Sequence, residues 1–153
     1  VRAYDVKASG CLECFACQKV LDAPGCGQKD GMLPVLDRIL KSDLVLWATP
    51  VFSWGWPGPV KSMLDRLYCM FKFQVEPWRM LLEGKKMALL VTAGGDEYDG
   101  ADVCVETYDK FIAFSRCASL GRFVAGGLGE PEATRADAVL AERARRFGES
   151  LLK

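Results

Sequence analysis

The cysteines near the amino terminus are the residues of this sequence with the clearest capacity for chemistry. Cys11, Cys14 and Cys17 form a C-x-x-C-x-x-C motif, and Cys26 follows after a gap of eight residues. Three thiolates at this pitch can bind one side of a [4Fe–4S] cube, and a more distant fourth can complete it. The same residues also fit thiols without a cluster, inert or redox-active, or a structural zinc site. Zinc is the least favoured, because four-cysteine zinc sites usually pair two separated C-x-x-C motifs.

The remaining composition narrows the chemistry further. The sequence contains no histidine, so it lacks the commonest general base and the Ser-His and Cys-His pairs of nucleophilic enzymes. We therefore predict no catalytic side chain and expect a bound cofactor to carry any enzymatic chemistry. The other three cysteines fall in helical or strand-edge patterns and are expected to be core residues: Cys69, Cys104 and Cys117.

A second candidate site is an aromatic loop in the middle of the chain. An unbroken apolar run, Leu44–Ala48, predicts a strand that is covered on both faces. Phe52, Trp54 and Trp56 follow it, separated by small residues, before a Pro-Gly-Pro segment that excludes regular structure. Such a loop suits a flat heteroaromatic ligand, although the aromatic rings could equally cap the core.

A glycine-rich loop forms the other half of this candidate site. The segment 93–100 (AGGDEYDG) follows a second apolar run at 85–92. Ligands of open α/β sheets bind beyond the carboxyl ends of the strands, so the two loops should lie side by side. Gly94 and Gly95 allow backbone amides to approach a ligand closely, and Asp96, Tyr98 and Asp99 add polar groups. Together the loops would suit the ring of a flavin.

The elements that position these loops alternate between strand and helix patterns. We expect strands at 1–7, 44–48, 85–92 and 120–125, and helices at 31–41, 60–71, 101–116 and 132–152, with a short helix possible around Trp78–Leu82. This alternation predicts one α/β domain over residues 1–153 with a parallel sheet and right-handed crossovers.

Charge and hydropathy exclude several kinds of partner. The 20 basic and 20 acidic residues cancel, so no basic field is available to attract nucleic acid or an acidic membrane surface. The apolar runs are too short to span a bilayer. Seven cysteines without a signal-peptide pattern favour a reducing, cytoplasmic location.

Taken together, these segments resemble the NADPH-dependent FMN reductase and iron–sulfur flavoprotein family. The resemblance is most specific at four places: Cys11–Cys17, Thr49–Phe52, Val60–Arg66 and Thr92–Gly95. It implies a flavodoxin-like fold and bound FMN. Electrons would come from NAD(P)H or a redox-protein donor, and the protein would be a homo-dimer or homo-tetramer. Alternatives are a non-catalytic electron carrier or redox-sensing module, and a cofactor-free interaction domain of the same fold.

The resemblance also implies which residues bind the cofactors. The FMN ring would contact Thr49, Pro50, Val51, Phe52, Ser53 and Trp54 in the first loop, and Ala93, Gly94, Gly95 and Asp96 in the second. A [4Fe–4S] cluster would bind Cys11, Cys14, Cys17 and Cys26, although the gap before the last of these is longer than is usual in the family.

One part of the family pattern has no counterpart in this sequence. Family members begin with a strand and a Ser/Arg/Thr-rich loop that binds the FMN phosphate, and nothing before Cys11 resembles that loop. In the flavodoxin strand order 2-1-3-4-5, the absent strand would lie between the strands expected at 1–7 and 44–48. Either the natural chain is longer or this version has lost the phosphate site, and we expect the former, with about forty preceding residues, roughly one strand–loop–helix unit.

Overall fold

The strand register of the sheet determines where this chain can form a site. The computed structural model describes all residues from 1 to 153 and contains a parallel three-stranded sheet in the order β1-β4-β5. Its strands are β1 (Leu44–Pro50), β4 (Lys86–Thr92) and β5 (Ala118–Ala125). β1 and β4 pair from Leu44 opposite Lys86 to Pro50 opposite Thr92. Both strands therefore end at the same level of the sheet.

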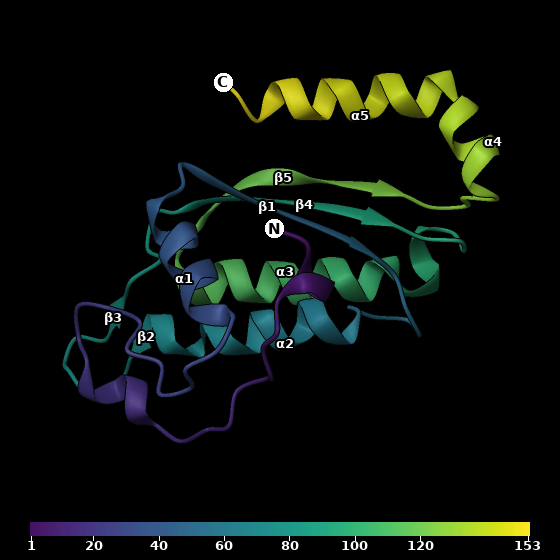
Figure 1. Cartoon of the computed structure of the whole chain (residues 1–153). Helices are drawn as coiled ribbons and strands as arrows, with labels where there is room; N and C mark the ends of the chain where they lie inside the picture. Colours follow the sequence, from purple (N-terminus) through teal and green to yellow (C-terminus); the bar gives the residue numbers. More distant parts are fainter.

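Helices lie on both sides of this sheet (Figure 1). One side carries α1 (Met32–Lys41), α2 (Gly58–Arg66) and α3 (Asp102–Ser115), and the other carries α5 (Ala138–Ser150) after the short α4 (Pro131–Ala136). α5 contacts β5, where Phe147 stacks on Phe123 with ring centroids 5.7 Å apart. The predicted α/β class, with helices around a parallel sheet, is confirmed. None of the helices is long and apolar enough to cross a membrane.

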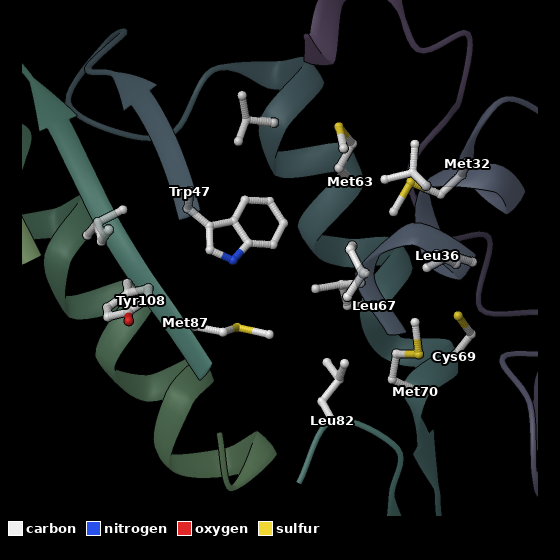
Figure 2. Close-up of a cluster of buried hydrophobic side chains, with 14 of the residues drawn as sticks. Met32, Leu36, Trp47, Met63, Leu67, Cys69, Met70, Leu82, Met87 and Tyr108 are labelled. Atoms are coloured by element: carbon white, nitrogen blue, oxygen red, sulfur yellow. The ribbon is translucent and has the colours of Figure 1, made fainter. Parts of the chain in front are cut away.

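The core on the α1–α3 side fixes both ends of α2. Trp47 of β1 and Met87 of β4 point from the sheet toward Met63 of α2 and Leu67 just beyond it, and Met32 of α1 lies behind them (Figure 2). Methionine side chains are flexible and fill irregular gaps between such elements. A helix held along its length in this way places the loop before it and the segment after it in fixed positions.

β1 is less covered than its apolar run predicts. Leu46 is 44% exposed, and only the opposite face of the strand, including Trp47, is buried. The reason is that α5 packs on β5 and leaves the same face of β1 open. The edge of β1 away from β4 also has no strand partner. Beside β1 and α1 lies an apolar groove of about 260 Å³, whose lining includes Val35, Ile39 and Val45.

The amino-terminal segment is not the strand that its weak alternation predicts. Residues 1–7 form a single 3₁₀ turn, η1 (Ala3–Asp5), which contacts α2. Lys7 accepts a hydrogen bond from the amide of Gly31, so the segment pairs with the start of α1 and does not join the sheet. The loop that follows contains a second 3₁₀ turn, η2 (Ala16–Lys19).

Three predicted helices are also corrected. α2 ends at Arg66 and not at Phe71, because the chain tightens into η3 (Leu67–Met70) and then forms β2 (Phe71–Lys72), which pairs antiparallel with β3 (Arg79–Met80). The helix suggested around Trp78–Leu82 is therefore absent. The long helix at 132–152 is interrupted at Asp137, whose carboxylate accepts a hydrogen bond from the amide of Leu140 at 2.9 Å and begins α5 as a new helix.

Candidate functional site

The aromatic loop and the glycine-rich loop lie side by side at the carboxyl ends of β1 and β4. The amide of Val51 continues the ladder by donating to the carbonyl of Thr92 at 2.8 Å. Beyond this bond the loops enclose an open hollow of about 340 Å³. It is lined by Val51, Ser53, Trp54, Ala93, Gly94, Gly95 and Asp99. We call it the loop hollow; it contains six of the ten residues that the sequence assigns to a flavin ring.

The other four assigned residues lie outside this lining. The Thr49 side chain is buried and donates to the carbonyl of Pro50 at 3.0 Å, while Pro50 and Phe52 are exposed. The carboxylate of Asp96 accepts a hydrogen bond from the amide of Tyr98 at 2.8 Å. This bond caps η4 (Glu97–Ala101), so the Asp96 side chain is engaged in holding the loop.

The tip of the aromatic loop is a tight turn in a strained conformation. Phe52 and Gly55 exchange backbone hydrogen bonds of 3.0 and 3.1 Å. Between them, Ser53 and Trp54 have φ values of 47° and 58°. Two left-handed residues in a two-residue turn are typical of type I′, which usually requires Asn-Gly or a similar pair. Side chains in this region cost free energy, and such strain is concentrated at functional sites.

A side-chain hydrogen bond locks the two loops together. The indole Nε1 of Trp54 donates to Oδ1 of Asp99 at 2.7 Å. Next to this bond, Gly100 has a φ of 95°, and a Cβ there would lie 2.7 Å from the Cα of Trp54. Gly100 thus provides both the left-handed conformation and the close backbone approach that the contact needs.

The loop hollow is rich in unpaired backbone donors. The amides of Ser53, Trp54, Gly94 and Gly95 donate no hydrogen bond to any other group of the protein. Backbone N–H groups in this state gain free energy from an acceptor. The pyrimidine edge of a flavin ring carries carbonyl oxygens and ring nitrogens that accept such bonds. The donor set and the adjacent indole therefore fit a flavin.

The four motif cysteines also gather at one place, near the far end of α2. Cys11, Cys14, Cys17 and Cys26 line a small hollow together with Cys69, which we call the cysteine hollow. Cys17, Cys26 and Cys69 are buried, Cys11 and Cys14 are exposed, and all are free thiols. No three His, Cys, Asp or Glu side chains are arranged to hold a metal ion in this structure.

The backbone of the motif bends so that its thiols face this hollow. Glu13 and Phe15, on either side of Cys14, have left-handed φ values of 53° and 55°. The amide of Glu13 donates to the sulfur of Cys11 at 3.4 Å. The set of four cysteine sulfurs matches the ligands that iron–sulfur clusters use.

Arg66 ties the cysteine loop to the end of α2. The side chain is 1% exposed, and its guanidinium donates to both carboxylate oxygens of Asp30 at 2.6 and 3.0 Å. It also donates to the carbonyl of Ser9 at 3.0 Å and to the sulfur of Cys26 at 3.2 Å. The bond from Arg66 holds the pKa of Asp30 below its usual value. One side chain thus anchors both ends of segment 9–30.

Lys72 is a second buried cation next to the cysteine hollow. Its ammonium donates to the carbonyls of Cys69, Cys17 and Pro24 at 2.7, 3.0 and 3.0 Å. No carboxylate lies within 4.0 Å of it, and burial lowers its pKa. Burial also raises the pKa of the Cys69 thiol to about 12.

Comparison with known proteins identifies the family. Residues 1–128 match the NADPH-dependent FMN reductase family. The chain belongs to this family. The resemblance stated from the sequence motifs is therefore confirmed.

Curated relatives of this FMN reductase family member carry related names. An iron–sulfur flavoprotein of Methanocaldococcus jannaschii is 28% identical over 124 residues, covering 79% of this chain and 59% of the relative. An FMN-dependent NADH:quinone oxidoreductase of Hydrogenovibrio crunogenus is 33% identical over 64 residues, covering 40% of this chain and 32% of the relative. The chain thus spans less than two thirds of the length of these relatives.

Solved structures agree on the fold. The azoreductase AzrA superimposes with a TM-score of 0.68 at 17% identity, covering 99% of this chain and 79% of that chain. A general stress protein 14 of Treponema denticola in complex with FMN gives a TM-score of 0.55 at 20% identity, covering 75% of this chain and 68% of that chain. The flavodoxin-like fold expected for an FMN reductase family member is confirmed.

Three residues beside the cysteine hollow were not found as site residues from the sequence. The sequence pattern predicts that Cys69 is a core residue. Its side chain is buried as expected, but it also lines the cysteine hollow. Arg66 and Lys72 reach the cysteine loop across 40 and 55 residues of sequence. Only the resemblance at Val60–Arg66 pointed to one of them, and it gave no reason for the arginine.

Gln18 is expected to contribute measurably to the stability of this family member. Its buried amide donates to the carbonyl of Phe71 at 2.8 Å and accepts from the amide of Phe73 at 2.9 Å. In Gln18→Leu both backbone groups lose their partner. We expect the free energy of unfolding to fall by about 1–3 kcal/mol, to be measured by urea unfolding. Gln74→Leu, at an exposed position that makes no side-chain hydrogen bond, should leave it nearly unchanged.

Proposed function

We propose that the chain is the ring-binding part of an FMN-dependent oxidoreductase that takes electrons from NAD(P)H, or from a redox protein, and passes them to an acceptor. The observation that carries this proposal is the loop hollow, where unpaired backbone amides of both loops lie beside the Trp54 indole. Membership of the NADPH-dependent FMN reductase family supports it.

In this proposal the protein binds and orients the ring and supplies no acid or base. When bound, FMN supplies the capacity to accept a hydride and to release electrons singly or in pairs. The amides of Gly94 and Gly95 would bind the polar edge of the ring, and Val51 would cover an apolar part of it. Asp99 is held by Trp54 and therefore positions the indole instead of acting on a substrate. The absence of histidine agrees with this division of roles.

We further propose that Cys11, Cys14, Cys17 and Cys26 bind a [4Fe–4S] cluster. All four line one hollow, and Arg66 donates a hydrogen bond to the sulfur of Cys26. When bound, such a cluster stores one electron. α2 connects the two candidate sites, because it begins beside the aromatic loop and ends at Arg66 (Figure 1). Its nine residues correspond to about 13 Å of helix.

The first test is an absorption spectrum of the product of the full-length gene, purified without oxygen. Two resolved flavin bands that bleach with NADPH or NADH are expected, over a broad shoulder from the cluster. Flavin that bleaches with dithionite but shows no turnover with either nicotinamide would favour a non-catalytic electron carrier. A colourless protein would contradict the flavin proposal.

Exposed aromatic residues surround the loop hollow, and we propose that a second copy of the protein covers them. Trp54 is 67% exposed and Tyr98 is 77% exposed, and Phe52 is exposed beside them. Trp56, by contrast, packs against Trp47 at 5.7 Å and donates to the carbonyl of Cys104, so it belongs to the core. Sedimentation of the FMN-loaded full-length protein should give a dimer or tetramer, and Tyr98→Ser should weaken it. A monomer would contradict this proposal.

We also propose that a further strand of the protein pairs with the free edge of β1. The unpaired backbone of that edge and the apolar groove beside it would both be covered by one strand. Hydrogen exchange of the full-length protein tests this. Slow exchange is expected at every second amide of β1, where the N–H points away from β4, and fast exchange there would contradict it.

A further inference from the structure

The charges around the cysteine hollow do not balance within the protein. Arg66 has Asp30 as its partner, whereas Lys72 is fully buried and has no carboxylate within 4.0 Å. Its three hydrogen bonds go to neutral carbonyls, which satisfy the donors of the ammonium but do not compensate its charge. A buried charge without an opposite charge is strongly disfavoured, so such a group normally faces an anion.

The cysteine sulfurs of the cysteine hollow lie next to Lys72, and they would carry concentrated negative charge as ligands of a cluster. Two of the carbonyls that the ammonium binds belong to Cys17 and Cys69, which both line this hollow. The third belongs to Pro24, two residues before Cys26. The nearest acidic side chain on the same loop, Asp22, is highly exposed and lies 3.8 Å from Arg79. Lys72 therefore lies under the backbone of the cysteine loop, at its inner side.

We infer that Lys72 is a positioning residue that balances the charge of an anionic group bound in the cysteine hollow and raises its reduction potential. The inference rests on the proposed cluster. A [4Fe–4S]²⁺ core with four cysteine thiolates carries a net charge of −2, and one added electron makes it −3. A fixed positive charge nearby favours the more negative state, because the attraction grows with each electron added. The low dielectric of the buried site strengthens this effect.

A purely structural role makes a different prediction. If Lys72 only ties η3 to the cysteine loop through its carbonyl bonds, its loss would lower stability and leave the potential of the cluster unchanged. Lys85 offers a matched control, since its ammonium also donates to two carbonyls, those of Leu40 and Ser42, and neither belongs to the cysteine hollow. The flavin of the same protein provides a second reference, as α2 separates it from Lys72.

The test is an anaerobic redox titration of the full-length protein with dithionite, in which the cluster is followed by electron paramagnetic resonance and the flavin by absorbance. Lys72→Met should retain iron and sulfide, and its cluster potential should become more negative. We expect a change of roughly tenfold or more in the equilibrium constant for reduction, which is about 59 mV per tenfold for one electron. Lys85→Met should leave the cluster potential as it is, and the flavin potential should not move in either variant.

Three outcomes would overturn the inference. An unchanged cluster potential in iron-loaded Lys72→Met would assign Lys72 to the scaffold. If Lys72→Met does not fold, Lys72→Gln keeps two N–H donors without the charge, and the same shift is expected there. If neither variant folds, Lys72 has a structural role only, and the inference is overturned. If the wild-type protein contains no iron, the proposed cluster itself is contradicted. The iron content therefore distinguishes failure of the cluster proposal from failure of the inference about Lys72.

Discussion

Replacing Gly100 with alanine is expected to lower the affinity of the full-length protein for FMN by roughly tenfold or more. The new Cβ would lie 2.7 Å from the Cα of Trp54, a distance that only movement of one backbone segment can relieve. Overpacking of this kind typically costs about 1–3 kcal/mol, and the left-handed φ of 95° adds about 1 kcal/mol for a residue with a side chain. The aromatic loop is strained already, so it should move away from Asp99 and open the loop hollow. FMN affinity is measured by fluorescence quenching of the flavin, and stability by urea unfolding.

Two control substitutions separate the causes. Gly84 also has a left-handed φ, 74°, but a Cβ there would meet nothing within 4 Å. Gly84→Ala should therefore cost only the conformational contribution of about 1 kcal/mol and leave FMN affinity unchanged. Gly95 makes the reverse comparison, because it has no left-handed φ, yet its Cβ would lie 2.8 Å from the Cβ of Asp99. Gly95→Ala should weaken FMN binding and cost stability only through the overpacking contribution of about 1–3 kcal/mol. Equal FMN affinity in Gly100→Ala and Gly84→Ala would contradict the proposed site.

The loop hollow could be predicted because its causes are local. Apolar runs determine β1 and β4, and parallel pairing brings Pro50 level with Thr92, so that the two following loops must meet. The details of the lining could not be predicted. The turn at Ser53 and Trp54 lacks the Asn-Gly pair that usually indicates a type I′ turn, and the bond from Trp54 to Asp99 joins residues 45 positions apart. Neither feature leaves a periodic pattern in the sequence.

The errors in secondary structure have tertiary causes. Leu67 and Phe71 continue the helical spacing of α2, yet the chain leaves the helix because Phe71 pairs with Met80 and is buried. Residues 1–7 alternate weakly, but they pack against α2 and accept a hydrogen bond from the start of α1, so they do not join the sheet. Asp137 interrupts a long amphipathic pattern because its carboxylate caps the next helix. In each case a contact outside the local window determined the outcome.

The cysteine hollow shows the same limit for a candidate site. The spacing of Cys11, Cys14 and Cys17 predicts that these thiols lie together, and the structure places Cys26 with them. The sequence could not show what lies beneath them. A single arginine at the end of a helix and a single lysine in a two-residue strand are ordinary surface residues by composition. Their burial is visible only once the cysteine loop is folded over them.

Replacing Arg66 with methionine is expected to lower the free energy of unfolding by about 3 kcal/mol. Removing one partner from a buried ion pair typically costs 3–5 kcal/mol, because the remaining charge is left uncompensated. The lower end applies here, since the Asp30 side chain is 22% exposed and can gain some hydration. The carbonyl of Ser9 and the sulfur of Cys26 also lose their donor. Urea unfolding measures the loss, and iron content per chain should fall as well, because both ends of the cysteine loop are released.

Two comparisons isolate the ion pair as the cause. Arg145 also binds two carboxylates, those of Glu142 and Glu149, but its side chain is exposed, so Arg145→Met should leave the free energy of unfolding nearly unchanged. In the double variant of Arg66→Met with Asp30→Asn no buried charge is left unpaired. The double variant should therefore lose much less free energy of unfolding than the sum of the two single losses. Additive losses in this cycle would show that the ion pair with Asp30 is not the cause, which would leave packing and the bonds to Ser9 and Cys26 as the contribution of Arg66.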